Sequence, residues 1–131
     1  MKRLSHGFTI IEILFVVVLL GAASVLFFVQ KNGLEVVARD EASKTAINAM
    51  YYSLEEVFYP TNKFYPQSIG SDSLKSMDPS LFTDTNGVKI GETGSTYTYE
   101  PTNCVDSKCQ GYTLKTTLEN EADFIKINRN N

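Results

Sequence analysis

The residues whose types and spacing could do chemistry lie near the amino terminus: Gly7, Phe8 and Glu12. Glu12 is the only charged residue in an apolar run over residues 8–29. Cleavage between Gly7 and Phe8 would expose a new amine on Phe8, one helical turn before the Glu12 carboxylate. An ammonium group of the same or a neighbouring chain would suit this carboxylate, because an unpaired charge in a low dielectric is strongly disfavoured. Glu12 is therefore a candidate functional carboxylate.

The only two cysteines, Cys104 and Cys109, lie in a predicted loop over residues 101–111. A disulfide is the expected state for a membrane-anchored domain that faces an oxidising compartment. A structural zinc site would need four ligands, and the sole histidine, His6, lies in the first seven residues. The C-x4-C spacing also differs from that of redox motifs. The sequence therefore predicts a disulfide and no metal.

The remaining carboxylates offer little chemistry. Glu119, Glu121 and Asp123 form either a cation site or a charged turn, and the charged turn is the prediction because their spacing matches no cation motif. Glu55 and Glu56 are expected on a solvated helix face. The sequence has no phosphate-binding glycine loop, His-based nucleophile pair or cluster of metal ligands. We therefore expect neither an enzyme nor a cofactor.

The apolar run over residues 8–29 is expected to be a helix that spans a membrane. A helix over residues 8–29 reaches about 33 Å, enough to cross a hydrocarbon core of about 30 Å. Lys2 and Arg3 precede it and favour a cytoplasmic amino terminus. The run is longer than the apolar region of a secretory signal, and no small-residue cleavage site follows it. A generic signal anchor, with Glu12 reaching to the interface, is the plainer alternative.

The order Lys2-Arg3, Gly7, Phe8-Thr9, Glu12 and apolar run resembles the class III leader of type IV pilins and pseudopilins. This resemblance implies cleavage after Gly7 and methylation of the Phe8 amine by a prepilin peptidase. It also implies that Glu12 pairs with the amine of an adjacent subunit as a filament grows. Gly21 matches a glycine common in these helices, whereas Val29 stands where many members have a helix-kinking proline. The resemblance lends some support to a calcium site near residues 119–123.

The function implied by the resemblance is a structural subunit of a surface filament for adhesion, twitching motility or DNA uptake. A type II secretion-like pseudopilin is the alternative within the family. The implied partners are copies of itself, other pilins, the prepilin peptidase and a pilus assembly platform in the membrane. The chain would be a single-pass protein of the inner or cytoplasmic membrane before assembly, and part of an extracellular pilus or periplasmic pseudopilus afterwards.

An alternative of another class is a single-pass, membrane-anchored binding domain that does not polymerise. Without Lys2 and Arg3, 10 of the 12 basic residues remain against 15 acidic ones, a net side-chain charge of −5. This charge argues against nucleic-acid binding by the head as a whole, although DNA uptake stays open.

Four segments follow from these patterns: a leader over residues 1–7, a transmembrane and assembly helix over 8–29, an amphipathic second half of that helix over 30–59, and a globular head over 60–131. Gly33 either ends the first helix or is a soft point in a continuous one, and Pro60 is expected to end the second half. Asp40 and Lys44 are placed to form an ion pair. Small and apolar residues recur at helical spacing; the main ones are Ala42, Ala46, Ala49 and Leu54. We expect them to pack on the head's own sheet, with contact between subunits as the alternative.

The head is expected to comprise a loop region over residues 60–87 and an antiparallel sheet over 88–131. Asp78 and Pro79 fit the start of a short helical turn. Strand patterns occur at 88–90, 96–100, 112–118 and 124–127. The predicted fold is α+β, with a long N-terminal helix packed through its second half on three or four strands. The sheet side of the core should come from Tyr97, Tyr99, Leu114 and Leu118.

Overall fold

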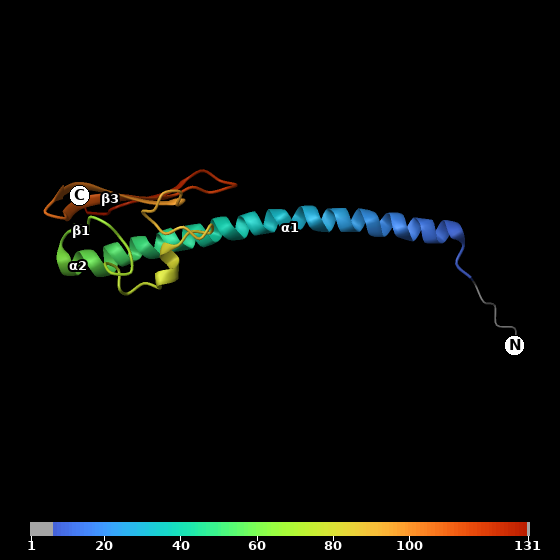
Figure 1. The fold of residues 1–131 in the computed structure, drawn as a ribbon, viewed down its shortest axis with the longest axis horizontal. Helices are drawn as coiled ribbons and strands as arrows, with labels where there is room; N and C mark the ends of the chain where they lie inside the picture. The colour runs from blue at the N-terminus through green and yellow to red at the C-terminus, as the bar shows by residue number, and fades with distance from the viewer. Residues whose placement is uncertain (1–6, 131) are drawn as a thin grey trace. The chain divides into compact units, whose positions relative to one another are not determined.

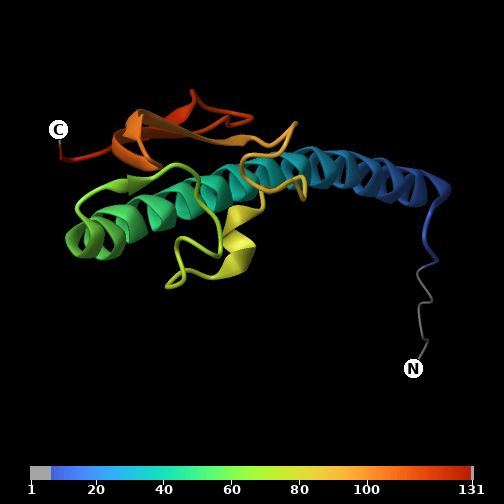
Figure 2. The same ribbon diagram turned by 60° about the vertical axis from the view of Figure 1, so that its left-hand side comes forward.

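The computed structural model describes residues 7–130, and the fold is α+β as predicted. One long N-terminal helix packs on a four-stranded antiparallel sheet (Figures 1 and 2). The elements in chain order are α1 (Ile10–Tyr52), a π-helical segment η1 (Ser53–Phe58), α2 (Tyr59–Asn62), β1 (Tyr65–Pro66), a 3-10 helix η2 (Pro79–Phe82), β2 (Tyr97–Val105), β3 (Lys108–Thr116) and β4 (Phe124–Ile127). The chain divides between Glu35 and Val36 into two compact units, which are described in turn. Residues 1–6 of the predicted leader lie outside the described residues.

The first unit is the amino-terminal part of α1. Thr9 precedes the helix, and its backbone oxygen accepts from the Glu12 and Ile13 N–H groups at 3.0 and 3.2 Å. The helix runs without a break through Val29 and Gly33. An ion pair between Lys31 and Glu35, at 3.8 Å, spans Gly33. Gly33 is therefore part of one continuous helix and does not end it.

In the second unit, α1 buries one face against the sheet. The buried side chains are Asp40, Ser43, Ala46, Ile47 and Met50. Ala46 is buried as predicted, but Ala49 is only half-buried and Ala42 is exposed, so the predicted packing of Ala42 is wrong. The helix turns Ile47 and Met50 inward because these larger side chains remove more apolar area from water than the alanines would.

The prediction that Pro60 ends the helix is wrong, because helical structure continues to Asn62. The turn before Pro60 is a π-helix in which the Tyr59 N–H donates to the Leu54 oxygen. A proline in an α-helix meets the carbonyl four residues earlier, and the wider π turn relieves that clash. The helix ends at Lys63, whose φ of 63° lies in the left-handed region.

The sheet is organised around β3, which pairs with the other three strands. A two-residue turn joins β2 to β3, formed by Asp106 and Ser107 with φ values of 49° and 64°. Positive φ at both positions suits a tight hairpin turn. The predicted loop over residues 101–111 is therefore wrong, because both strands run through it. Pro101 is tolerated because β2 lies at the edge of the sheet.

Three further predictions about the head fail locally. The strand at 88–90 reduces to a single bridge between Thr83 and Lys89. The strand at 112–118 ends at Thr116, because the Asp40 carboxylate binds the following backbone at Glu119 and Asn120. The loop over 60–87 contains β1, which pairs with β3.

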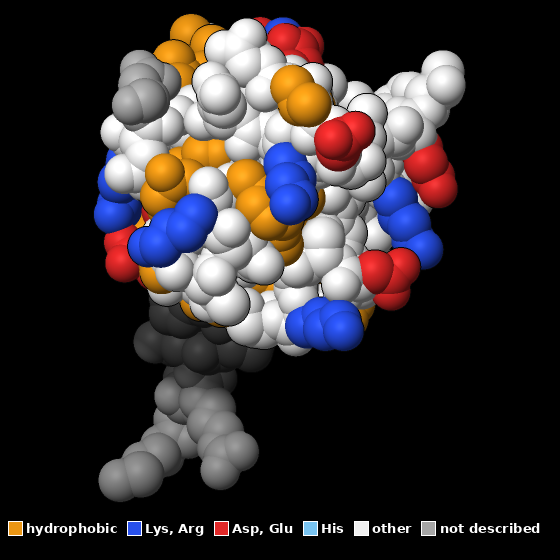
Figure 3. Space-filling model, turned by 90° about the vertical axis from the view of Figure 1, so that its left-hand side faces the viewer, with side chains coloured by type: hydrophobic (Ala, Val, Ile, Leu, Met, Phe, Trp, Pro, Cys, Tyr) orange, Lys and Arg blue, Asp and Glu red, His pale blue; other side chains and the backbone are white. Residues whose placement is uncertain are grey.

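Other predictions about the head are confirmed. The Asp78 side chain caps η2 by accepting from the Ser80 N–H at 2.9 Å, and β4 occupies the predicted segment. Tyr97, Leu114 and Leu118 are buried as predicted, and Tyr99 packs partly buried against the core. The end of the head that carries α2 and β1 presents hydrophobic side chains between lysine and arginine side chains (Figure 3).

Candidate functional site

The predicted cleavage site lies ahead of the helix. Gly7 and Phe8 are outside any regular element and exposed, and α1 begins at Ile10. An extended, exposed peptide bond is the form of backbone that a protease can bind. Glu12 lies in the first turn of α1, where a carboxylate also complements the helix dipole.

The helix that follows Glu12 is apolar on every side. From Ile13 to Val29 its large apolar side chains are each 46–67% exposed in this single chain. Its one hydroxyl, Ser24 Oγ, donates to the Leu20 oxygen at 2.7 Å and so needs no water. This helix is long and apolar enough to cross a membrane. A continuous apolar surface of this kind requires lipid or other helices around it.

Glu12 carries the only charged side chain on the apolar part of this helix, residues 8–29. Within residues 7–130 no side chain donates to its carboxylate or forms an ion pair with it. Taken into a membrane, the carboxylate would need a partner from elsewhere. The Glu12 carboxylate can therefore be the anionic member of an ion pair whose cation comes from elsewhere.

A second carboxylate, Glu55, organises the head, and its predicted solvent exposure is wrong. Glu55 is only 5% exposed. Its carboxylate accepts from the Tyr112 hydroxyl at 2.8 Å, from the Tyr65 hydroxyl at 3.1 Å, from the Arg129 N–H at 3.2 Å and from Asn130 Nδ2 at 3.3 Å. These bonds tie β1, β3 and the carboxyl-terminal residues to one buried group on η1. Its neighbour Glu56 is exposed as predicted.

Both tyrosines are held as donors to Glu55. Burial, with the hydrogen bond to Glu55, raises the pKa of Tyr112 far above its ordinary value. Burial also raises the pKa of Tyr65. The π-helical turn explains why the sequence pattern missed Glu55: Ser53, Leu54 and Glu55 are all buried in succession, which a regular amphipathic helix does not allow. Pro60, one turn later, is the only signal that could have indicated the irregular turn.

The turn over residues 119–123 is held by basic residues. Each of its carboxylates engages a different one: Glu119 with Arg39 at 2.6 Å, Glu121 with Lys44 at 2.7 Å, and Asp123 with Lys115 at 3.5 Å. The Arg39 hydrogen bonds hold the pKa of Glu119 below its ordinary value. Within residues 7–130, no group of three or more His, Cys, Asp or Glu side chains is placed to hold a metal.

The predicted ion pair between Asp40 and Lys44 is wrong. Asp40 is buried and accepts from the Glu119 and Asn120 N–H groups at 2.9 and 3.0 Å. Lys44 instead contacts Glu41 and Glu121, and the hydrogen bond to Glu121 is the main cause of its raised pKa. The acidic turn thus docks on α1 through both backbone and side-chain contacts.

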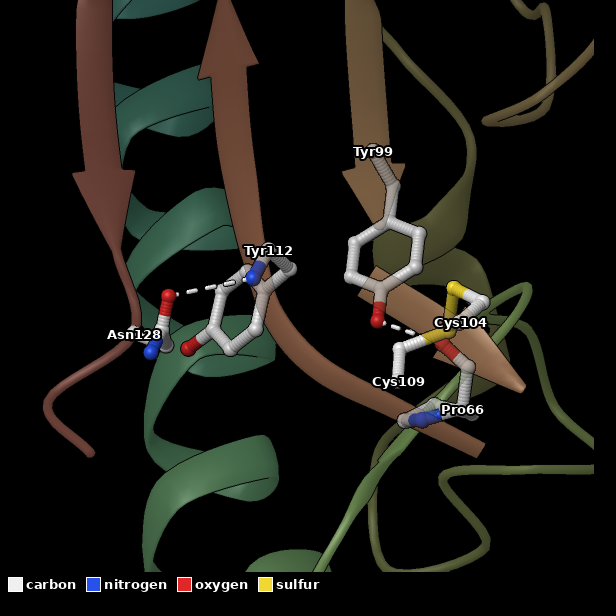
Figure 4. Close-up of a disulfide and its surroundings, with 6 residues drawn as sticks. All are labelled: Pro66, Tyr99, Cys104, Cys109, Tyr112 and Asn128. Carbon is white, nitrogen blue, oxygen red and sulfur yellow. Dashed lines mark hydrogen bonds between the residues drawn. A yellow bond between two sulfur atoms is a disulfide. The ribbon is translucent and has the colours of Figure 1, made fainter. Parts of the chain in front are cut away.

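Cys104 and Cys109 form the predicted disulfide, which links opposed residues of β2 and β3 (Figure 4). Nearby, the Tyr99 hydroxyl donates to the Pro66 oxygen at 2.6 Å and fastens β1 to the hairpin. On the other side of β3, the Tyr112 N–H donates to Asn128 Oδ1 at 3.1 Å. The disulfide therefore lies where the hairpin and β1 meet.

Comparisons with protein-family models, with curated proteins and with solved structures each give no match to this chain.

Proposed function

We propose that this chain is a structural filament subunit of the type IV pilin kind. A prepilin peptidase cleaves it after Gly7 and methylates the new amine of Phe8. The mature chain is then held in the membrane by residues 8–29 and polymerises through that segment. The observation that carries the proposal is Gly7-Phe8-Thr9-x-x-Glu12 at the start of a helix that is apolar on all sides.

The Glu12 carboxylate, which has no ion-pair partner within residues 7–130, favours assembly over simple anchoring. An ion in hydrocarbon is disfavoured by several kcal/mol unless it is paired. Cleavage provides an ammonium group one helical turn from Glu12, at an axial offset of about 6 Å. When one helix slides past another by about that offset, the amine of one subunit meets the carboxylate of the next. The ion pair thus favours one register among many that apolar side chains alone would accept.

The head supports a mechanical role. The acidic turn holds it on the second part of α1, and the Glu55 cluster holds it on η1. The disulfide cross-links β2 and β3 within the head. Tension along a filament would be carried by the helices, and these contacts resist separation of the head from α1. We propose a surface filament for adhesion, twitching motility or DNA uptake, with partners limited to other pilins and the assembly machinery. A periplasmic pseudopilus for protein secretion is the variant of the same proposal.

The experiment replaces Glu12 in the native host and follows both processing and assembly. Glu12→Gln keeps the size of the side chain and removes its charge. We expect this variant to be cleaved normally but to be absent from filaments sheared off the cells. Glu35→Gln, a change to an exposed glutamate of the same helix, is the matched control and should assemble. Normal filaments from Glu12→Gln would refute the pairing mechanism, and a protein never found in sheared filaments would indicate a monomeric anchor.

A further inference from the structure

A cavity of about 600 Å³ opens on the head between the end of α2 and the β2–β3 hairpin. This volume falls within the range of small-molecule sites, about 300–1,000 Å³. Its lining combines aromatic rings, ammonium groups and carboxamides: Tyr59, Phe64, Lys63, Lys108, Asn103 and Gln110. Figure 3 views the head from this end and shows hydrophobic side chains lying between cationic ones.

The aromatic rings of this cavity are held in place by other rings. Tyr59 stacks on the buried Tyr65, with ring centroids 4.8 Å apart. Phe64 contacts Phe58 edge-on at 5.8 Å. The Lys108 ammonium lies 5.4 Å from the Phe64 ring centroid. The cavity thus places the apolar ring of Phe64 next to the positive charge of Lys108, and packing on Phe58 holds the ring in position.

The polar side chains of the cavity are available to a ligand. Among the described residues, neither Lys63 nor Lys108 forms an ion pair. No side chain or backbone group in residues 7–130 hydrogen-bonds the carboxamides of Asn103 and Gln110. Asp106 is the single acidic residue in the lining. The cavity therefore offers two cations and two free carboxamides.

The backbone around the cavity is unusual. In the described part of the chain, four residues other than glycine have a positive φ, and three of them line this cavity: Lys63, Asn103 and Asp106, at 63°, 51° and 49°. Lys63 ends α2 in this conformation and Asp106 forms the hairpin turn, so the positive φ values belong to the two chain reversals that border the cavity. The disulfide cross-links the hairpin beside the cavity, since Cys109 is part of the lining and Cys104 follows Asn103 directly.

We propose that this cavity binds an anionic saccharide, a sugar that carries a carboxylate or a phosphate. The apolar face of the sugar ring packs on Phe64 and Tyr59. The anionic group lies between the ammonium groups of Lys63 and Lys108, and hydroxyl groups bond the carboxamides. A single nucleic-acid strand fits less well, because it needs a succession of cations along a groove and the whole chain has a net charge of −3. This proposal does not depend on filament assembly.

The test measures binding to the full-length protein in micelles of lauryldimethylamine oxide, a detergent without sugar or phosphate. The probes are trigalacturonate, phosphorylated maltotriose, neutral maltotriose and a short oligothymidylate. The two anionic saccharides separate a carboxylate ligand from a phosphate ligand. The test variant is Lys63→Gln with Lys108→Gln. Lys75→Gln with Lys89→Gln is the matched control, because these two lysines are exposed and lie outside the cavity.

We expect at least one anionic saccharide to bind more tightly than maltotriose, and the cavity variant to weaken that binding about tenfold or more, equivalent to about 1.4 kcal/mol. The control variant should bind as the wild type does. Phe64→Leu, which keeps apolar volume but removes the aromatic face, should also weaken binding. The proposal is overturned by binding to none of the saccharides, by equal binding of maltotriose, by equal loss in the control, or by binding of the oligothymidylate alone.

Discussion

The buried Glu55 carboxylate should contribute more to the stability of the head than any exposed ion pair. Glu55→Ala would remove the acceptor of four donors: the Tyr65 and Tyr112 hydroxyls, the Arg129 N–H and Asn130 Nδ2. Asn130 is exposed and can bond water instead, which leaves three donors without an acceptor. Each such donor costs about 1 kcal/mol or more when it stays buried, so we expect a loss of about 3 kcal/mol in the free energy of unfolding. For a domain of this size, the Tm should fall by roughly 12 °C or more.

Glu55→Gln separates the loss of charge from the loss of an acceptor. The Gln oxygen can still accept from Tyr112, but its amide group would face the Asn130 amide, which donates in the wild type. We expect a loss of about 1 kcal/mol. Glu56→Ala is the matched control, because Glu56 is the next residue, is exposed and, within residues 7–130, forms its one ion pair with the Arg129 side chain.

Unfolding is best followed by tyrosine fluorescence with increasing urea. The chain has no tryptophan, so the signal comes from its 7 tyrosines, of which Tyr65 and Tyr112 contact Glu55 directly. The predicted order of stability is wild type, then Glu55→Gln, then Glu55→Ala, with Glu56→Ala close to wild type. If Glu55→Ala unfolds at the same urea concentration as Glu56→Ala, the buried carboxylate does not hold the head together.

Two further predictions concern the hairpin and the turn before β2. Replacing Cys104 and Cys109 by serine should lower the free energy of unfolding by about 2 kcal/mol, since the loop they close is short, and a reducing agent should then have no further effect on the urea midpoint. Asp84 is buried, which raises its pKa, but backbone hydrogen bonds from Thr96, Val88 and Asn86 outweigh burial and leave its pKa below the ordinary value. Its contribution to stability is therefore present at neutral pH and is lost as the pH falls below about 4. Asp84→Asn should destabilise the head at pH 7 more than at pH 3, and an equal effect at both would contradict this reasoning.

The long helix and the sheet class were predictable because each rests on a periodic pattern. The apolar run over 8–29 and the alternation at Tyr112 and Leu114 each repeat over several residues, so a local irregularity does not hide them. The disulfide was also predictable, since two cysteines allow a single pairing.

The errors at Ala42 and after Thr116 arise from contacts between residues distant in the sequence, and the error at Glu55 arises from an irregular helical turn. Ala42 shares the helical period of the core, but the sheet packs on the face that carries Ile47, and only the tertiary structure selects between them. Glu55 turns inward because a π-helical turn changes the period just before Pro60. The strand after Thr116 stops early because Asp40 captures the backbone of Glu119 and Asn120. None of these effects leaves a periodic trace in the local sequence.

The hairpin shows a different kind of error. Asn103, Asp106 and Pro101 are residues typical of loops, and they led to a predicted loop over residues 101–111. The structure uses Asp106 in a two-residue turn and places Pro101 in the edge strand. These residue types correctly indicated a turn. The turn itself has only two residues, Asp106 and Ser107, and is far shorter than the predicted loop over residues 101–111.

The position and the methylation of the amino terminus test the proposed function most directly. The direct measurement is mass spectrometry of the amino-terminal peptide from protein isolated from its native host. The proposal predicts a peptide that begins at Phe8 and carries one methyl group on its amine. A peptide that begins at Met1 would indicate an uncleaved membrane anchor, and one that begins after residue 20 would indicate an ordinary secretory signal. Either of these results would contradict the assignment of Gly7, Phe8 and Glu12 to filament assembly.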